Sequence, residues 1–587
     1  MIGSVLLLRL TFLVALLLPA LAGAASPPAT ESRNGAVVSA QRHAAEVGIE
    51  ILRQGGNAID AAVAMGYAEA VTNPCCGNIG GGGFMTAWLA DGRAVFFNFR
   101  ETAPAAAAPD MYLDASGQVI RGASLIGWKA VAVPGTVAGL DAALTRYGTM
   151  NRARVMAPAI RLAREGFILD RGDADIIARA APRLHRNPIA AEIFLRPDGT
   201  PPQPGDRLVQ ADLARTLEAI AERGPDAFYH GAIPGAVEAA SRQGGGLLTA
   251  ADFAAYRAIE TVPLRCTYRG LTILSAPPPS SGGVTLCQIL AIPEGYDLHA
   301  LGYHSARSVQ VMTEAMRQAY LDRNTYLGDP AFVANPVERL LSREHAAAIR
   351  ARIGDRATPS DALLPSLNTN EKPETTHYSV LDAQGNAVSV TYTINGAFGA
   401  GVIADDTGFL LNNEMDDFTA KPGVANMFGL VQGAANAIAP GKRPLSSMAP
   451  TIVLRDGRVF LVLGSPGGSR IITTVLQVIL NIVDHRMAPQ QAVDAPRLHH
   501  QWLPDTIYAE PFALSPDTKA LLEQRGYTIT EQTPWGAAAL IAVAPPAGRG
   551  TGVASSGPDS AATFGMRPGF IYGANDSRRP AGAALGY

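Results

Sequence analysis

The chain has 587 residues, of which 48% are hydrophobic and 17% are charged, and its formal net charge is −3. This is the composition of a globular protein with enough apolar material for a large core. The charges are nearly balanced and form no basic stripe, which argues against nucleic acid as a partner.

The first 24 residues are expected to be a signal peptide. Arg9 carries the only side-chain charge before an apolar run at 10–18, and Ala22-Gly23-Ala24 fits a small-residue cleavage site. The run is shorter than the roughly 20 residues that a membrane-spanning helix needs, and an uncleaved anchor is the alternative. We therefore expect an exported protein, periplasmic or secreted, without a stable membrane span.

The cysteines and histidines give no metal-binding pattern. The four cysteines stand at positions 75, 76, 266 and 287, unlike the spacing of a zinc site. An oxidising compartment would permit a disulfide such as Cys266–Cys287, and buried free thiols are the alternative. The histidines include no HExxH pair. We expect no metal and no cofactor.

Before residue 375 the sequence predicts helices separated by glycine-rich turns. Gly55-Gly56-Asn57 indicates a turn, and the alanine-rich stretch 58–70 after it indicates a helix. Residues 84–89 look like a strand, and since no GxGxxG motif opens a helix there, a dinucleotide-binding fold is excluded. Apolar residues spaced three to four apart predict a helix at 305–326. Residues 357–373 are polar and are expected to form a surface linker.

After residue 375 the pattern changes to short strands. Residues 378–381 and 387–394 alternate as strands do, with a turn at 382–386 between them. In the second strand the period of two places the hydroxyl groups on one face, which a hairpin would lay beside Thr375. Hairpin strands flanked by helices predict a layered α+β or α/β sandwich.

Farther along, residues 460–463 are expected to be a strand. A glycine-rich turn at 465–470 and a helix at 471–483 follow. Residues 545–569 are rich in glycine, serine and proline and are interpreted as a surface insertion.

Thr375, at the start of the predicted hairpin, is a candidate nucleophile. A threonine hydroxyl needs a neighbouring base, and cutting the Glu374–Thr375 bond would free the threonine's own α-amino group for that role. Its pKa of about 7.7–8.0 lets it accept a proton near neutral pH. The chain would then be a precursor that cleaves itself and works as two pieces. An ordinary threonine at a strand start is the alternative.

Two further features could complete a site for acyl transfer. Thr393 could hydrogen-bond the nucleophile, although a strand hydroxyl needs no such role. Gly467-Gly468 precedes the helix predicted at 471–483, and backbone N–H groups in that position can hold an oxyanion. A plain pair of loop glycines is the alternative.

Other polar residues could bind an amino acid. Arg100 could clamp a carboxylate through two parallel hydrogen bonds, and Ser446-Ser447 adds two hydroxyls. Glu414 and Asp417 could hold an ammonium group. Taken one at a time, these residues are also typical of an exposed ion pair, turn hydroxyls and a solvated acidic turn. Together they would fit an α-amino acid.

These segments resemble those of the γ-glutamyltransferases, also called γ-glutamyl transpeptidases or glutathione hydrolases. These are N-terminal-nucleophile hydrolases made as self-cleaving precursors. The similarity covers most of the mature chain and is densest after residue 375. There the matching segments are TTHYSV, NNEMDDF, KRPLSSMAPTIV and GSPGGSRIITTVLQV. Upstream they are GGNAIDAAVAM, NPCCGNIGGGGFMT, FRETAP, PGTVAG, PPPSSGG and YLGDP.

The resemblance implies a four-layer αββα sandwich shared by two subunits. Residues 25–374 would form the large subunit and 375–587 the small one, paired as a heterodimer after self-cleavage. The implied reaction is attack of the Thr375 hydroxyl on the γ-amide of glutathione, which releases cysteinylglycine. Water, or an amino acid or dipeptide acceptor, would then take the γ-glutamyl group from the enzyme.

The resemblance also implies a role for each matched position. The catalytic set is the nucleophile Thr375, the assisting hydroxyl of Thr393, and the oxyanion hole at Gly467 and Gly468. The contacts to the γ-glutamyl α-carboxylate are Arg100, Ser446 and Ser447. The contacts around its α-amino group are Asn395, Glu414 and Asp417.

This chain departs from the family pattern at two places. Bacterial relatives gate the pocket with a tyrosine after the NNxMDDF segment, and by register that position is Phe428. Phenylalanine can cover the pocket but cannot donate a hydrogen bond to Asn395, which suggests a looser lid. Cys75-Cys76 replaces other residues, and the sequence offers no reason for it.

The sequence is also compatible with two rival functions. A cephalosporin or glutaryl acylase of the same fold binds an acyl group without the α-amine, so it needs no acidic site for an amine. An exported binding homologue would never cleave itself. The competent residue at every matched catalytic position argues against the second rival.

Overall fold

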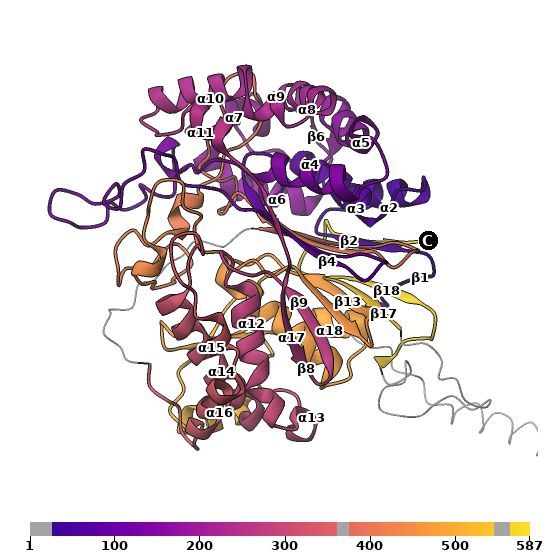
Figure 1. Cartoon of the computed structure of the whole chain (residues 1–587), viewed down its shortest axis with the longest axis vertical. Coiled ribbons are helices and arrows are strands. Elements are labelled where there is room, and N and C mark those ends of the chain that lie inside the picture. Colours follow the sequence, from indigo (N-terminus) through magenta and orange to yellow (C-terminus); the bar gives the residue numbers. More distant parts are fainter. Residues whose placement is uncertain (1–25, 361–374, 545–563) are drawn as a thin grey trace, which may run out of the picture.

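A computed structural model describes residues 26–360, 375–544 and 564–587. The predicted signal peptide, most of the linker at 357–373 and most of the insertion at 545–569 lie outside the described residues. Within them, helices and antiparallel strands build four layers, with two sheets stacked face to face between two helical layers (Figure 1). The predicted αββα sandwich is confirmed.

The first sheet carries the candidate nucleophile. In the described residues its strand order is β19-β2-β10-β11-β3-β4-β7, with every pair antiparallel. The strands are β2 (Ala36–Ser39), β3 (Gly82–Trp88), β4 (Ala94–Phe99), β7 (Ile259–Thr261), β10 (Thr376–Leu381), β11 (Ala387–Thr393) and β19 (Ala583–Gly586). Strands from before and after residue 375 are therefore interleaved in one sheet, since β2 lies between β19 and β10, and β3 pairs with β11.

The second sheet has the order β1-β18-β17-β13-β12-β9-β8 and is also antiparallel throughout the described residues. Its strands are β1 (Thr30–Ser32), β8 (Leu264–Tyr268), β9 (Leu271–Ser275), β12 (Thr451–Arg455), β13 (Arg458–Gly464), β17 (Ala539–Val543) and β18 (Ile571–Asn575). A smaller pairing joins β5 (Phe167–Ile168) to β6 (Arg207–Leu208). In another small sheet, β15 (Ile507–Ala509) pairs antiparallel with β14 (Leu498–His499) and parallel with β16 (Ile529–Glu531).

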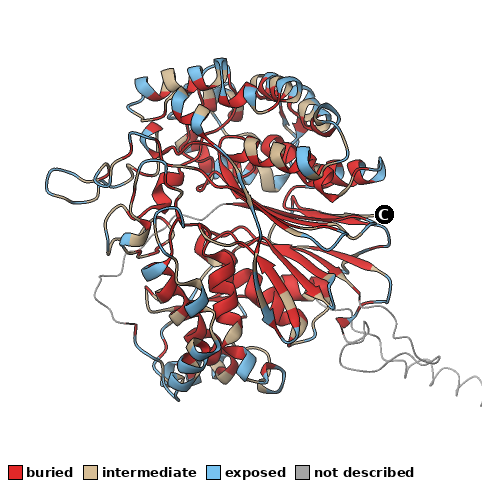
Figure 2. Ribbon diagram, in the orientation of Figure 1, coloured by how far each residue is buried: buried red, intermediate tan, exposed pale blue. Residues whose placement is uncertain are grey.

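Each sheet buries its outer face under helices, and the inner strands are almost entirely buried (Figure 2), whereas the edge strands β7 and β8 are partly exposed. On the first sheet lie α2 (Arg42–Arg53), α3 (Ala58–Thr72), α4 (Thr136–Tyr147), α5 (Arg152–Glu165), α6 (Arg171–Leu184), α7 (Pro188–Phe194), α8 (Ala211–Arg223), α9 (Asp226–Tyr229), α10 (Ala232–Gln243) and α11 (Ala250–Ala255). The helical layer on the side of the second sheet consists of α12 (Gly282–Ala291), α13 (Leu298–Leu301), α14 (Ala306–Tyr326), α15 (Val337–Leu340), α16 (Arg343–Arg352), α17 (Ile471–Val483), α18 (Pro489–Asp494) and α19 (Pro516–Gln524). None of the helices described is long and apolar enough to cross a membrane.

The predicted local elements are confirmed, with small shifts at their ends. The helix expected at 58–70 is α3, and Asn57 caps it by accepting hydrogen bonds from the backbone of its first turn. The strand expected at 84–89 begins two residues earlier, at Gly82. The helix expected at 305–326 is α14, with Ser305 as its N-cap.

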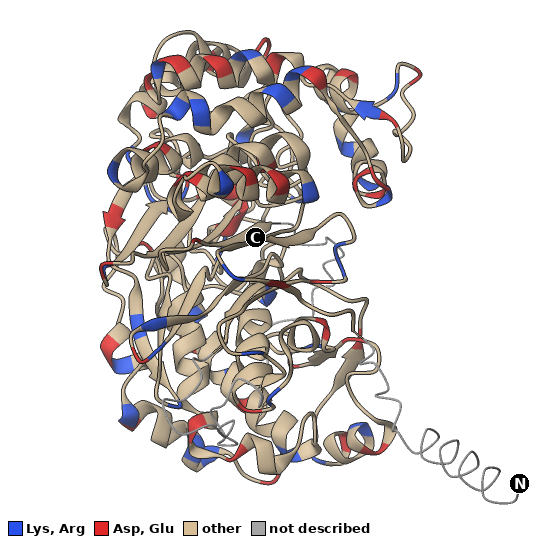
Figure 3. Cartoon of the chain, turned by 90° about the vertical axis from the view of Figure 1, so that its right-hand side faces the viewer, with Lys and Arg blue, Asp and Glu red and all other residues tan. Residues whose placement is uncertain are grey.

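All four cysteines are oxidised in the structure. Cys266 of β8 is joined to Cys287 of α12, and Cys75 is joined to its neighbour Cys76. The free-thiol alternative is therefore wrong for both pairs. Acidic and basic residues are interspersed along the helices in the side view of Figure 3.

The hairpin of β10 and β11 has both faces buried. Its apolar face, with Val388 and Val390, packs into the first helical layer. Its hydroxyl face lies against the second sheet, where Ser389 Oγ donates to Leu463 O at 3.0 Å. Hydrogen bonds across the sheet interface therefore satisfy the polar face that the alternation predicted.

His377 lies in this sheet interface. Its two ring nitrogens meet the hydroxyls of Thr391 and Ser379 at 2.8 and 3.1 Å. A Cβ atom at Gly464 of β13 would come within 2.2 Å of the imidazole ring, so only glycine fits there. Burial lowers the pKa of His377 to about 3.

We expect His377 to make the fold acid-sensitive. The unfolded chain takes up a proton near pH 6.5, whereas the folded chain resists protonation down to about pH 3. The unfolded state binds more protons in this window, so stability falls as pH falls, by roughly 1.4 kcal/mol per pH unit for one group. Measured on the uncut Thr375→Ala chain, thermal unfolding midpoints at pH 5 and pH 7 should therefore differ less when His377→Gln is added than without it. Equal differences would contradict this expectation.

Candidate functional site

Thr375 lies directly before β10, beside the end of β11. The register that pairs Thr376 with Tyr392 sets Thr375 opposite Thr393, and their Oγ1 atoms are 3.2 Å apart. Both residues are buried. Thr393 Oγ1 also accepts a hydrogen bond from the backbone N–H of Asn395 at 2.8 Å. The hairpin therefore holds two hydroxyls in contact, as the alternation pattern predicted.

A narrow cavity opens at Thr375. Nine of the ten residues predicted for the site line it: Arg100, Thr375, Thr393, Asn395, Glu414, Asp417, Ser446, Ser447 and Gly468. The tenth, Gly467, lines an adjoining cavity. The free room in the narrow cavity is about 20 Å³, roughly enough for one water molecule.

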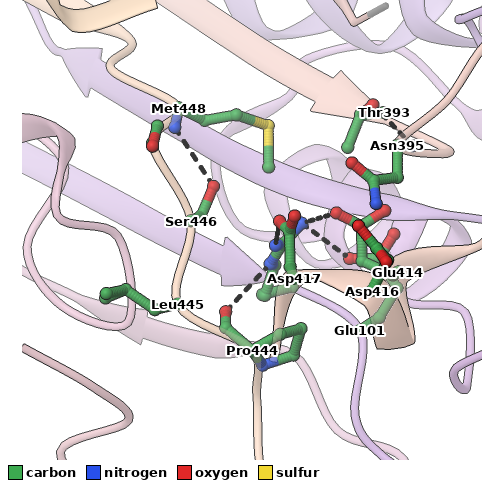
Figure 4. A network of polar contacts seen from close by, with 12 residues as sticks. Glu101, Thr393, Asn395, Glu414, Asp416, Asp417, Pro444, Leu445, Ser446 and Met448 are labelled. Carbon is green, nitrogen blue, oxygen red and sulfur yellow. Dashed lines mark hydrogen bonds and ion pairs between the residues drawn. The ribbon is translucent and has the colours of Figure 1, made fainter. Parts of the chain in front are cut away.

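Arg100, immediately after β4, is the central cation of this cavity. Its guanidinium is fully buried and forms ion pairs with Glu414 and Asp417, and its Nε donates to Pro444 O at 3.2 Å. Glu101 Oε2 lies 3.4 Å from Nη1. Figure 4 shows Glu101, Glu414 and Asp417 converging there, with Thr393 and Asn395 close by. The alternative of an exposed ion pair is wrong.

The acidic turn is buried as well. Glu414 and Asp417 belong to the 3₁₀ turn η3 (Glu414–Asp417) and are 0% and 7% exposed, so the alternative of a solvated turn is wrong. Burial raises the pKa of both carboxyls, and it raises the pKa of Glu101 to about 7. Three carboxyls around one guanidinium leave an excess of acceptor groups over positive charge.

The excess acceptors around Arg100 are three specific carboxylate oxygens. Glu101 Oε1, Glu414 Oε2 and Asp417 Oδ1 are buried and receive no hydrogen bond from any described residue. Buried polar atoms are normally paired, and unpaired ones carry a desolvation cost. An ammonium group carries three N–H donors and one positive charge. These oxygens are therefore suited to a bound amine.

Asn395 closes the same side of the cavity. Its backbone is in the left-handed region, at φ +73°, which asparagine tolerates better than most residues. Its Nδ2 donates to Asn413 O at 3.1 Å, and this contact ties the end of β11 to the loop before the acidic turn.

The serine pair is held by a residue that the sequence analysis missed. Ser447 Oγ accepts from Arg323 Nη2 at 3.0 Å, and Ser446 Oγ accepts from Met448 N at 3.1 Å. Arg323 comes from α14, lies buried in the cavity wall, and has its pKa lowered to about 10 by burial. It stands three residues before the start of the YLGDP segment, but an arginine in an amphipathic helix usually faces solvent.

Gly467 and Gly468 form the remaining wall. Their φ angles are +137° and +55°, a region that favours glycine, and they lead through the 3₁₀ turn η5 (Gly468–Arg470) into α17. The N–H groups of both glycines have no acceptor among the described residues. Two unpaired N–H groups beside a hydroxyl nucleophile can stabilise an oxyanion.

Phe428 lies between two cavities. It lines the narrow cavity and also the adjoining one, which has a volume of about 840 Å³. Its ring is half-buried, and its carbonyl accepts from Gln501 Nε2 at 3.1 Å. The position assigned to the lid from the sequence is therefore at the boundary of the narrow cavity. Across the described residues, no group of His, Cys, Asp and Glu is arranged to hold a metal ion.

Comparisons with known proteins agree with this geometry. The family model "Gamma-glutamyltranspeptidase" matches residues 44–584. The glutathione hydrolase proenzyme of Pseudomonas sp. (strain A14) is 51% identical over 96% of each chain. Acylase ACY 1 proenzyme of Pseudomonas sp. (strain V22) is 42% identical over 86% of this chain and 88% of its own. The crystal structure of cephalosporin acylase from Bacillus halodurans matches with a TM-score of 0.80 and 26% identity, covering 97% of this chain and 98% of that one.

Proposed function

This chain belongs to the gamma-glutamyltranspeptidase family, and we propose that it cleaves the γ-glutamyl amide of glutathione and related compounds. The γ-glutamyl group passes to water or to the amine of an amino acid or dipeptide. One observation carries this assignment: beside the Thr375 hydroxyl, a buried guanidinium adjoins three carboxylate oxygens that lack a donor. That arrangement matches a zwitterionic α-amino acid.

Thr375 acts as nucleophile in this proposal. Its Oγ1 bonds to the γ-carbonyl carbon, and the Thr375 α-amino group takes the hydroxyl proton. The N–H groups of Gly467 and Gly468 hold the negative oxygen, and Thr393 orients the hydroxyl through the 3.2 Å contact. The carbon–nitrogen bond then breaks, and the proton passes to the leaving amine. Water or an acceptor amine reverses these steps at the ester.

Six side chains recognise the γ-glutamyl group. Arg100 binds its α-carboxylate with Ser446 and Ser447, for which Arg323 fixes the Ser447 hydroxyl. The group that binds the α-ammonium consists of Asn395, Glu414 and Asp417. In the free protein the Arg100 guanidinium forms ion pairs with the carboxylates of Glu414 and Asp417. The α-carboxylate and the α-ammonium of the substrate replace these contacts, so both charges of the substrate meet an opposite charge that is already in place.

The Thr375 hydroxyl also carries out the self-cleavage that matures the precursor. The signal peptide 1–24 is removed on export to the periplasm or the medium. The precursor then cuts itself before Thr375 into a large subunit, 25–374, and a small subunit, 375–587. The relatives named as proenzymes support a cut precursor. The interleaved strands of the first sheet support a heterodimer that stays together.

The acylase alternative is tested by parallel turnover of a γ-glutamyl and a glutaryl anilide, which differ only in the α-amine. We expect the γ-glutamyl compound to be strongly preferred, because only its ammonium neutralises the carboxylate oxygens. Equal turnover, or a preference for the glutaryl compound, would assign the chain to the acylases. Binding of glutathione without turnover by an uncut chain would favour the degenerate homologue.

We expect Phe428→Tyr to change how the acyl enzyme is resolved. A phenol at the lid can donate a hydrogen bond to Asn395, whereas the phenyl ring cannot. A better-closed lid should alter the ratio of transfer to hydrolysis by about two- to tenfold, corresponding to the roughly 0.5–1.5 kcal/mol of one hydrogen bond. The ratio is measured with glutathione and glycylglycine. An unchanged ratio would contradict the looser-lid interpretation.

A further inference from the structure

The adjoining cavity has a positively charged side chain on its wall that the reaction steps above do not use. Arg470 ends the turn that contains Gly467 and Gly468, and it lines the 840 Å³ cavity on the far side of Phe428. Its guanidinium carbon lies 4.5 Å from the ring centre of Trp535 and 5.2 Å from that of Tyr508. It also donates a hydrogen bond to Gln532. The aromatic rings and the amide fix the position of the cation.

No carboxylate of the described residues forms an ion pair with Arg470. The nearby Glu510 is already engaged, since both of its oxygens accept from Arg578. Arg578 is paired further with Asp576. Burial lowers the pKa of Arg470, consistent with a cation held away from water. A partly buried guanidinium without a counter-ion is a strong binding group for a carboxylate.

Arg470 is placed to reach a leaving group two residues long. An extended dipeptide places its carboxylate about 7 Å from its amine nitrogen, at roughly 3.4 Å per residue. Gly467, which directly precedes the 3₁₀ turn η5, and Arg470, which ends it, line the same cavity of about 840 Å³. A leaving group whose amine lies beside the glycine pair can therefore extend along this cavity toward the guanidinium. A single amino acid is only half as long.

We propose that Arg470 binds the C-terminal carboxylate of a dipeptide, both when the dipeptide leaves as part of the donor and when it enters as an acceptor. This inference rests on the proposed function and assigns a specificity residue to its second substrate. Trp535 and Tyr508 hold the guanidinium, and Phe428 separates the dipeptide from the γ-glutamyl cavity. The class of ligand is a short peptide with a free carboxylate.

The first test compares donors that differ in the leaving group. In Arg470→Gln, kcat/KM for glutathione should fall by about 10- to 100-fold, the scale of a charge-assisted hydrogen bond. For the γ-glutamyl anilide, which has no carboxylate on its leaving group, it should change by less than about threefold on the same scale of reasoning. Arg470→Lys should restore part of the loss. An equal loss on both donors would mean that Arg470 only positions the glycine pair, and no loss on glutathione would also overturn the proposal.

A matched control removes a similar arginine elsewhere. Arg455 lies 4.0 Å and 5.2 Å from the ring centres of Phe460 and Phe564, outside both cavities. Arg455→Gln also removes an arginine that contacts two aromatic rings, and it should leave the ratio between the two donors at the wild-type value. A shift of that ratio as large as in Arg470→Gln would overturn the proposal.

The second test needs no variant. With wild-type protein and the anilide donor, glycylglycine should be a better acceptor than glycylglycinamide, whose carboxylate is capped, by a similar 10- to 100-fold in kcat/KM. Equal use of the two acceptors would overturn the assignment of Arg470, even though hydrolysis of the anilide would still support the proposed function. Failure of all γ-glutamyl turnover would instead reject the proposed function itself.

Discussion

Thr375→Ala is expected to remain one uncut chain and to lose turnover by roughly 10³-fold or more, the scale seen when a nucleophile is removed. In the proposed mechanism, the hydroxyl that this variant lacks attacks both the preceding peptide bond and the γ-amide. Cleavage and turnover should therefore disappear together. Intact mass and N-terminal sequencing of the purified exported protein measure the first, and release of the aniline from the γ-glutamyl anilide measures the second.

Thr375→Ser is the matched control, because it keeps the hydroxyl and the 3.2 Å partner on Thr393. It should still yield two chains, one of them beginning at residue 375, with slower turnover. A wild-type protein that stays in one piece would remove the self-processing mechanism. Two pieces from the alanine variant would assign the cut to another protease.

Asp417→Asn should lower kcat/KM for the γ-glutamyl anilide by roughly 10²- to 10³-fold or more while leaving the glutaryl anilide nearly unchanged. The substrate ammonium loses a buried ionic partner, and removing one member of a buried pair costs about 3–5 kcal/mol. Each 1.36 kcal/mol is about tenfold in rate. A glutaryl group has no ammonium, so it cannot lose this interaction. The ratio of the two kcat/KM values is the measurement.

Asp416 provides a control one residue away. Its two oxygens accept from Ser124 Oγ at 2.6 Å and from Met427 N at 2.9 Å, and it does not line the narrow cavity. Asp416→Asn keeps the size of the side chain and should leave the substrate ratio unchanged. If Asp417→Asn lowered both anilides equally, the carboxylate would support the fold of the turn rather than bind the amine.

Local patterns in the sequence predicted the elements that hold the nucleophile. The alternation in 387–394 predicted which side chains share a face, and a tight turn fixed the register, so Thr375 and Thr393 meet as expected. The cap at Asn57 and the helix after it also depend only on neighbouring residues. These are contacts across a few positions of the chain, which periodicity reveals.

Burial and long-range pairing were harder to predict. Arg100 and Glu414 are 314 residues apart, and each in isolation has the composition of an exposed turn. Burial comes from the stacking of the layers, which no local pattern contains. Arg323 and Arg470 were missed for the same reason: an arginine in or beside a helix indicates a solvated surface until its surroundings are known.

Strands from both sides of residue 375 share the first sheet, and this arrangement affects how the cut protein unfolds and refolds. Strand β2 lies between β10 and β19, so a strand from before residue 375 is hydrogen-bonded on both sides to strands from after it. Folding of the precursor is unimolecular, whereas recovery of the cut protein from denaturant requires two separate chains to find each other. After processing, the lifetime of the native state is therefore governed by its barrier to unfolding rather than by a reversible equilibrium. The uncut precursor should refold readily under conditions in which the mature pair does not.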